Sequence, residues 1–126
     1  MDKNSTSSWR KAPPESEIFF EEILKDHPDT EKRRMFGYPC AFLHGNMFFG
    51  LFQDSMFLRL SETDRVDIIQ LGEGVHFEPM PGRPMKEYVA LSPGAVSDQE
   101  KFNNWFTKSH AYAASLPQKV KKGGKK

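Results

Sequence analysis

Cys40 and His44 are the two residues of this 126-residue chain whose types suit nucleophilic catalysis. An imidazole that accepts the thiol proton would generate a reactive thiolate, provided that the two groups are within hydrogen-bond distance. Four residues apart on one extended strand, they point to the same side at a separation of about 13 Å, which is too far. Free cysteine is among the most buried residue types, so we expect Cys40 to pack in an apolar core.

The histidines and carboxylates form no recognisable metal or phosphate motif. A metal site needs three or four convergent ligands, and two of them usually lie close together in sequence. No HExxH, CxxC, calcium-loop or phosphate-loop pattern occurs, and the neighbouring carboxylates are typical of solvated helix faces. The histidines fall singly on four predicted elements, at His27, His44, His76 and His110. We therefore expect no catalytic residue, no metal and no cofactor.

A basic group stands out as a candidate contact for an anion or an acidic peptide. Lys32, Arg33 and Arg34 precede or begin the first predicted strand, and Arg83 lies at the tip of a loop rich in proline and glycine. Cations beside unpaired backbone N–H groups can bind an anion. The alternative is that the three consecutive cations protect a sheet edge from aggregation and pair with acidic side chains.

An aromatic group suggests an interface. The predicted strand from Met47 to Gln53 contains Phe48, Phe49 and Phe52, which cannot all enter one core if side chains alternate between two faces. Either Phe49 or the pair of Phe48 and Phe52 then faces outward, unless a helix covers the second face. Phe49 and Phe52 are therefore candidate interface residues for a protein partner or a second copy of the chain.

The elements that must position these residues follow from the spacing of apolar residues. Helical spacing predicts a helix over about 15–26, a second that starts at Ser61 as N-cap, and a third capped by Ser97 or Asp98. Val66, Ile69 and Leu71 are expected on the apolar side of the second helix. Short apolar runs between turn signals predict strands over 34–36, 40–44, 47–53, 56–60, 75–78 and 86–91, with Gly37-Tyr-Pro39 between the first two.

This pattern predicts an α+β fold of order α-β-β-β-β-α-β-β-α. Tight turns at Gly45-Asn46 and Asp54-Ser55 would join consecutive strands as an antiparallel meander. The strand over 56–60 alternates as a strand with one buried face does. We expect a two-layer domain with an antiparallel sheet of about five to six strands and its helices gathered on one side.

Composition and charge set the outer limits of this interpretation. No apolar run approaches the roughly 18 to 20 residues of a membrane span, no signal-like stretch occurs near the start, and the single cysteine fits a reducing cytoplasm. We expect a flexible lead-in over residues 1–13, one domain over 14–117 and a disordered lysine-rich tail over 118–126. The tail carries a charge of +5 and the lead-in +2, so the domain carries −6 of the total of +1.

The tail contains two glycines and almost nothing apolar to bury, so it is either solubilising or a weak electrostatic contact for nucleic acid. An acidic domain is a poor match for a phosphate backbone, which rewards a basic face. The lysines that would make the contact are Lys119, Lys121, Lys122, Lys125 and Lys126.

Over about residues 18–117 the chain resembles the N-terminal domain of the TfoX/Sxy family. Individually the shared segments are common, and their order carries the resemblance. They are Arg34-Met-Phe-Gly37, Gly45-Asn-Met-Phe48, Phe57-Leu-Arg-Leu60, and a Gly-Arg-Pro loop before Glu87-Tyr88-Val89. Where the family often has a second glycine after Met-Phe-Gly, this chain has Tyr38 followed by Pro39.

The resemblance implies the α+β arrangement and an association with bacterial competence regulation, and it brings no catalytic residues. Regulators of the competence type resemble this domain followed by a C-terminal helical domain, so we expect a stand-alone use of the module in a prokaryotic cytoplasm. We expect a non-catalytic regulatory or interaction module that binds a protein partner or itself through the sheet. The alternative is a nucleic-acid-linked competence regulator that uses the tail with Arg33, Arg34 and Arg83. No membrane partner is expected.

Overall fold

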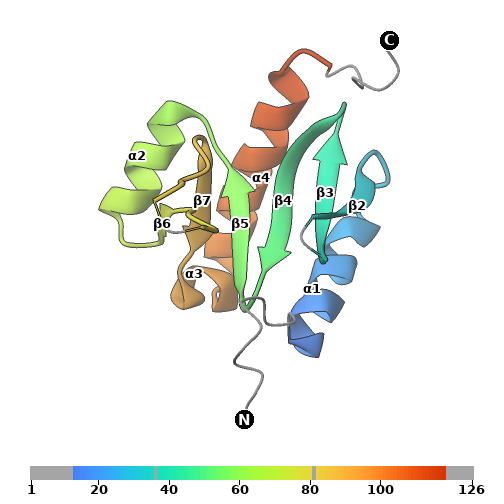
Figure 1. The fold of residues 1–126 in the computed structure, drawn as a ribbon, viewed down its shortest axis with the longest axis horizontal. Coiled ribbons are helices and arrows are strands. Elements are labelled where there is room, and N and C mark those ends of the chain that lie inside the picture. The colour runs from blue at the N-terminus through green and yellow to red at the C-terminus, as the bar shows by residue number, and fades with distance from the viewer. Residues whose placement is uncertain (1–12, 36, 81, 119–126) are drawn as a thin grey trace.

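A computed structural model describes residues 13–35, 37–80 and 82–118 (Figure 1). Residues 1–12 of the expected lead-in and residues 119–126 of the expected tail lie outside these ranges. The elements, in chain order, are α1 Pro14–Lys25, β2 Glu31–Met35, β3 Tyr38–Leu43, β4 Asn46–Phe52, β5 Ser55–Arg59, α2 Glu62–Gln70, β6 Gly74–His76, β7 Tyr88–Leu91, α3 Pro93–Ser97 and α4 Gln99–Ser115.

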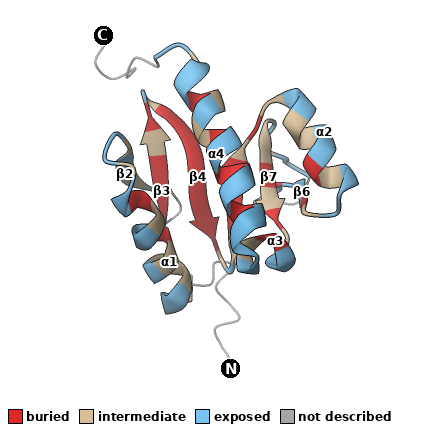
Figure 2. Cartoon of the chain, turned by 180° about the vertical axis from the view of Figure 1, so that it is seen from behind, coloured by how far each residue is buried: buried red, intermediate tan, exposed pale blue. Residues whose placement is uncertain are grey.

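The predicted α+β fold is confirmed. Six strands form one sheet in the order β2-β3-β4-β5-β7-β6, and every neighbouring pair is antiparallel. Both α1 and α4 place a ring against Phe49, Phe20 at 5.0 Å and Phe106 at 5.2 Å between centroids, so these two helices cover the same face (Figure 2). The short helix α3 was not predicted; Ser92 caps it, accepting a hydrogen bond from the N–H of Ala95 at 3.2 Å.

Side-chain hydrogen bonds cap the N-termini of α2 and α4, as predicted. The Ser61 hydroxyl accepts the N–H of Asp64 at 3.3 Å, and the Asp98 carboxylate accepts that of Lys101 at 3.1 Å. The predicted apolar side of α2 is partly wrong, because α2 turns Ile68 toward the sheet. A Cβ atom on Gly74 would lie 3.1 Å from Ile68. Val66 and Leu71, which were expected on the apolar side of this helix, are 47% and 64% exposed.

Both hairpin turns occur one residue earlier than predicted. Leu43 pairs with Asn46, which leaves His44 and Gly45 as the two central residues of the first turn. Their φ angles are +53° and +82°, and a two-residue turn of this kind needs positive φ at both positions. In the second hairpin Gln53 has a φ of +55°. Histidine and glutamine at such positions are weak turn signals, so sequence placed the turns on the residues that follow.

A β-bulge orients the phenylalanines of β4. Ala41 pairs with Phe49 and Phe42 with Met47, so Phe48 is an extra residue without an opposite partner. As a result Phe48 and Phe49 both reach Phe106 on α4, at 5.8 and 5.2 Å between ring centroids. The prediction that Phe49 faces outward is wrong: its side chain is completely buried.

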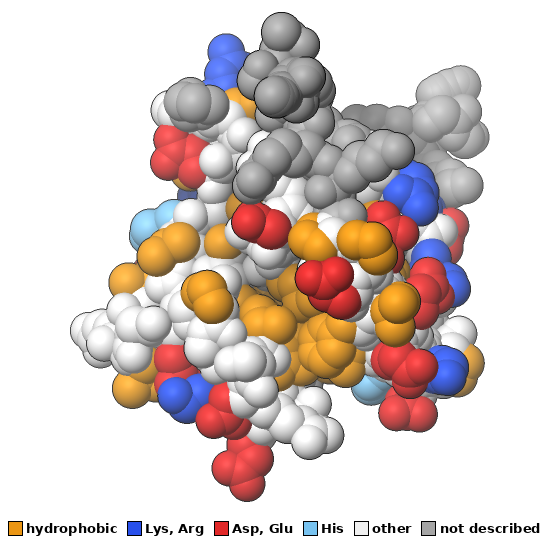
Figure 3. All heavy atoms as spheres, turned by 90° about the horizontal axis from the view of Figure 1, so that it is seen from below, with side chains coloured by type: hydrophobic (Ala, Val, Ile, Leu, Met, Phe, Trp, Pro, Cys, Tyr) orange, Lys and Arg blue, Asp and Glu red, His pale blue; other side chains and the backbone are white. Residues whose placement is uncertain are grey.

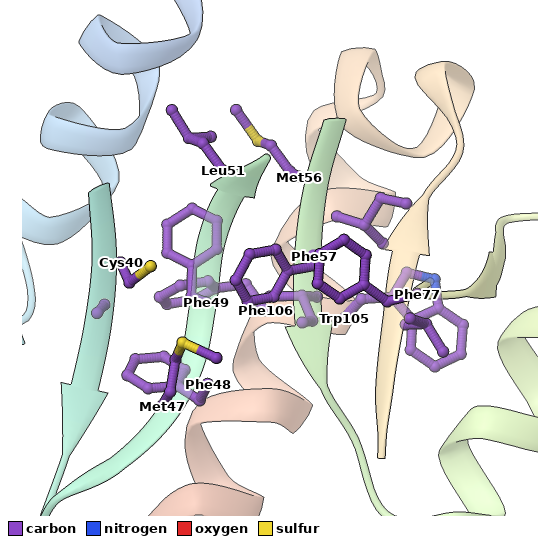
Figure 4. Close-up of a cluster of buried hydrophobic side chains, with 14 of the residues drawn as sticks. Cys40, Met47, Phe48, Phe49, Leu51, Met56, Phe57, Phe77, Trp105 and Phe106 are labelled. Carbon is purple, nitrogen blue, oxygen red and sulfur yellow. The ribbon is translucent and has the colours of Figure 1, made fainter. Parts of the chain in front are cut away.

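The second face of the sheet is also covered, so Phe52 is not an open interface residue either. Phe77, which follows β6, stacks on Phe57 at 4.5 Å and 15° and meets Phe52 edge-on at 5.5 Å (Figure 4). Phe52 is 8% exposed, and all of β4 is buried (Figure 2). The strand over 56–60 is therefore buried on both faces, not on one as predicted. The segment that contains Phe77 covers the face without helices.

Candidate functional site

The three consecutive cations of β2 are already paired. Lys32 Nζ lies 2.7 Å from a carboxylate oxygen of Glu21 on α1, and Arg33 binds both carboxylate oxygens of Glu31 at 3.0 Å. Arg34 donates to a backbone carbonyl of the turn after β2 at 2.6 Å. Because β2 forms one edge of the sheet, this arrangement agrees with the alternative that the cations protect an edge and pair with acids.

Arg83 does not join these cations. It lies in the loop between β6 and β7, and β6 forms the edge of the sheet opposite β2 (Figure 1). The loop is closed by its own groups: Glu78 accepts the N–H of Gly82, and Arg83 donates its N–H to Met80 at 2.8 Å. The N–H groups of Gly82 and Arg83 therefore already donate within the loop and are not free to bind an anion. In Figure 3, cationic side chains are scattered among acidic ones on the face seen from below. The five tail lysines lie outside the described residues.

Cys40 is buried in the core, as the sequence predicted. Burial raises the pKa of its thiol to about 11, so the thiol is protonated at neutral pH. His44 is exposed in the β3–β4 turn and does not extend the strand that holds Cys40. The two residues thus form no nucleophilic pair.

The structure brings together a polar cluster that sequence reasoning missed. Arg59 at the end of β5 contacts Glu87, just before β7, with Nη2 2.6 Å and Nε 2.7 Å from the same carboxylate oxygen. Tyr112 on α4 donates to the other oxygen at 3.4 Å. The Arg59 guanidinium also lies 5.7 and 5.9 Å from the ring centroids of Tyr88 and Tyr112. Three elements far apart in sequence therefore meet at one cation.

The electrostatics of this cluster follow from partial burial. Burial alone would raise the pKa of Glu87, but the hydrogen bond and positive charge of Arg59 bring that pKa below its ordinary value. Burial raises the pKa of Tyr88 to about 12, and its hydroxyl donates to the Met47 carbonyl at 2.9 Å. The cluster therefore holds one carboxylate ionised against one guanidinium, with the neighbouring phenol neutral.

Glu87 also has an unusual backbone. Its φ is +88°, a region that disfavours any residue with a Cβ, and its carbonyl accepts the N–H of Leu60 at 2.9 Å. Such a conformation persists where the surroundings hold it. Here the ion pair with Arg59 and the contact with Tyr112 hold the side chain while Leu60 holds the backbone.

A second convergence joins two histidines and one carboxylate. The rings of His27, after α1, and His110, on α4, lie 5.0 Å apart between centroids. Asp29 Oδ2 lies 3.3 Å from His110 Nε2. One donor atom from each of the three residues falls within 4.8 Å of the other two, a group able to hold a metal ion. The sequence places these two histidines on separate elements, and the fold brings them together.

The edge formed by β6 is bordered by an apolar groove of about 360 Å³. Val75, in the middle of β6, is 63% exposed, and Val66 on α2 is 47% exposed. The groove lies between α2 and β6 and is lined by Glu62, Arg65, Val66, Ile69, Gln70 and His76. This edge and its groove combine exposed apolar side chains with strand backbone.

The sequence model of the TfoX N-terminal domain matches residues 22–113. The chain belongs to the TfoX N-terminal domain family. This confirms the resemblance drawn from the ordered motifs. No curated protein and no solved structure gives a significant match. Among the described residues, none of the helices has the length and apolar character needed to cross a bilayer.

In this TfoX N-terminal domain, segments that carry the resemblance meet in space. The Phe57-Leu-Arg-Leu60 segment supplies Arg59, and the segment after the Gly-Arg-Pro loop supplies Glu87. Their ion pair fastens β5 to the start of β7. The Gly45-Asn-Met-Phe48 segment supplies the first hairpin turn and the bulge. The shared motifs thus set strand connections of this domain.

Proposed function

We propose that this domain is a non-catalytic protein-interaction module whose docking element is the edge strand β6, and that the strand pairing with it belongs to a second copy of the chain. The supporting observations are the exposure of Val75, the outer edge of β6, which pairs with no other strand among the described residues, and the contrast with the other edge of the sheet. The central strand β4 is buried and paired on both sides, so another strand can add only at an edge of the sheet.

The two edges differ in charge. The first four residues of β2 are charged, Glu31 to Arg34, and charged side chains discourage strand addition. Strand β6 reads Gly-Val-His and has neither an acidic side chain nor a lysine or arginine. Its central side chain is apolar and exposed. The edge of β6 therefore lacks the protection that β2 has.

The backbone of β6 offers the hydrogen bonds for such pairing. Glu73 and Phe77, on either side of β6, are bonded to the β7 segment at 2.9 and 3.0 Å. Antiparallel pairs alternate between bonded and non-bonded positions, so Val75 also faces β7. The N–H and C=O groups of Gly74 and His76 then point away from β7; His76 is exposed at the edge, whereas Gly74 is buried beside Ile68 of α2.

A second copy satisfies this edge with two-fold symmetry. If two β6 strands pair antiparallel about Val75, Gly74 of each copy lies opposite His76 of the other, which allows four backbone hydrogen bonds. The two Val75 side chains become a non-bonded pair, the closer of the two kinds, with Cα atoms about 4.5 Å apart. The groove beside Val66 adds apolar surface to this contact.

Sedimentation velocity of the full chain over a wide concentration series tests the proposal. We expect a concentration-dependent dimer that Val75→Lys abolishes. Ile18→Lys is a matched control, because Ile18 on α1 is also 63% exposed and lies away from β6. Hydrogen exchange should show the amides of Gly74 and His76 slowing as the concentration rises. A chain that stays monomeric throughout, or a dimer weakened equally by both substitutions, overturns the proposal.

A further inference from the structure

We propose that His27, Asp29 and His110 form a binding site for a divalent transition-metal ion, of which Zn²⁺ is the representative case. The site lies where the turn after α1 meets α4. Phe48 of β4 borders the site, and β5 and β7 separate β4 from β6 in the sheet.

The turn that presents two of the ligands is held in place. Thr30 donates both its N–H, at 3.1 Å, and its hydroxyl, at 2.7 Å, to the carbonyl of His27. Pro28 occupies the second position of this four-residue turn, where its fixed φ is favourable. His27 and Asp29 therefore project from a backbone that is already ordered, which is the condition for a metal site of useful affinity.

Aromatic packing orients both imidazoles. The His27 ring lies 5.0 Å from the ring of Phe106, and the His110 ring meets Phe48 edge-on at 5.6 Å. His110 Nε2 is buried and has no hydrogen bond among the described residues, although Asp29 Oδ2 is 3.3 Å away. A buried ring nitrogen beside a carboxylate without an aligned hydrogen bond is a position that a cation would satisfy.

The spacing suits a small tetrahedral ion. Zn²⁺ binds imidazole nitrogen and carboxylate oxygen at about 2.0–2.2 Å, so two of its ligand atoms lie about 3.4 Å apart. The donor atoms here lie within 4.8 Å of one another, and His110 Nε2 and Asp29 Oδ2 are already at 3.3 Å. The Asp29 side chain is 54% exposed, so its carboxylate is able to reorient toward an ion. Two histidines and one carboxylate leave a fourth position for water.

Calorimetric titration of the full chain with Zn²⁺, and with Co²⁺ as a spectroscopic probe, tests the site. We expect one ion per chain, a visible Co²⁺ absorption typical of tetrahedral coordination, and a Zn²⁺-induced rise of about 5 °C or more in the unfolding midpoint at saturating metal. Asp29→Asn, which keeps the shape of an exposed side chain, and His110→Gln should each weaken binding at least tenfold.

His44→Asn is the matched control, because it removes an exposed histidine from a turn whose positive φ asparagine also accepts. It should leave the Zn²⁺ affinity within twofold of the unaltered chain. Circular dichroism of each metal-free variant should match that of the parent, which separates loss of a ligand from loss of the fold. The proposal is overturned if the parent binds neither ion, if Asp29→Asn binds as tightly as the parent, or if His44→Asn weakens binding as much as His110→Gln.

Discussion

Arg59 and Glu87 lie 28 positions apart in sequence, yet the Arg59 guanidinium places two nitrogens within 2.7 Å of one carboxylate oxygen of Glu87. The pair bridges the end of β5 and the start of β7, and it holds Glu87 in a backbone conformation that few residues adopt. The charge of Glu87 and its backbone conformation affect stability separately, and each effect can be measured on its own.

Glu87→Gln tests the electrostatic contribution. Arg59 keeps the pKa of Glu87 below its usual value, so the stabilisation is present above the unfolded-state pKa of about 4.3 and is lost as pH falls through the lower folded-state value. We expect the substitution to lower the free energy of unfolding by about 1 kcal/mol at pH 7. Urea titrations should show this difference constant from pH 6 to 8 and shrinking below about pH 4. A difference unchanged down to pH 2 contradicts the assignment.

A second pair of variants isolates the backbone contribution. Glu87→Ala and Glu87→Gly both remove the carboxylate, but only glycine accepts a φ of +88° without steric cost. We expect the glycine variant to be more stable than the alanine variant by about 1 kcal/mol, the reverse of the usual order of these two residues. Thermal and urea unfolding of the two proteins side by side provide the measurement, and alanine being the more stable would refute the strain.

Gly50→Ala tests the close packing of the face without helices. A Cβ at this position would lie 2.5 Å from the ring of Phe57 and 3.2 Å from Cys40 Sγ, and both side chains are fully buried. We expect a loss of about 2 kcal/mol in the free energy of unfolding, because neither neighbour can move into open space. Gly94→Ala in α3 is the control, since no atom lies within 4 Å of its added Cβ. Equal effects of the two substitutions would contradict this packing.

Sequence patterns predicted those features that depend on neighbours along the chain. The cap at Ser61 is a hydrogen bond to a residue three positions on, and the face of α4 that holds Phe102, Trp105 and Phe106 repeats with the helix. Both are local, so the residue types specify them. The hairpins were predicted for the same reason, although His44 and Gln53 were too weak as turn signals to fix their positions.

The orientation of the β4 side chains was beyond sequence reasoning. It depends on the register between β3 and β4, where one extra residue turns Phe48 to the same side as Phe49. The cover on the second face comes from Phe77, which is separated from β4 by a helix and two strands. Alternation along a single strand contains no information on either event, so Phe49 and Phe52 were assigned to an interface that the fold buries.

The polar convergences were beyond sequence reasoning for a similar reason. His27 and His110 come from opposite ends of the domain and meet because α1 and α4 share one face of the sheet. Arg59 and Glu87 meet because β7 inserts between β5 and β6 in the strand order. The sequence His-Pro-Asp-Thr did indicate the turn that holds Asp29, but no local pattern indicated that His110 lies beside it.

The complete burial of β4 has a consequence for synthesis. Its sequence, Asn-Met-Phe-Phe-Gly-Leu-Phe, has no charge and no proline, the composition of segments that assemble into fibrils when exposed. Phe77 and Phe102, which cover its two faces, are translated 25 and 50 residues after Phe52. At about 5–20 residues per second, each nascent chain carries this strand uncovered for several seconds. We therefore expect β4 to be the segment of the growing chain most prone to aggregation until α4 is made.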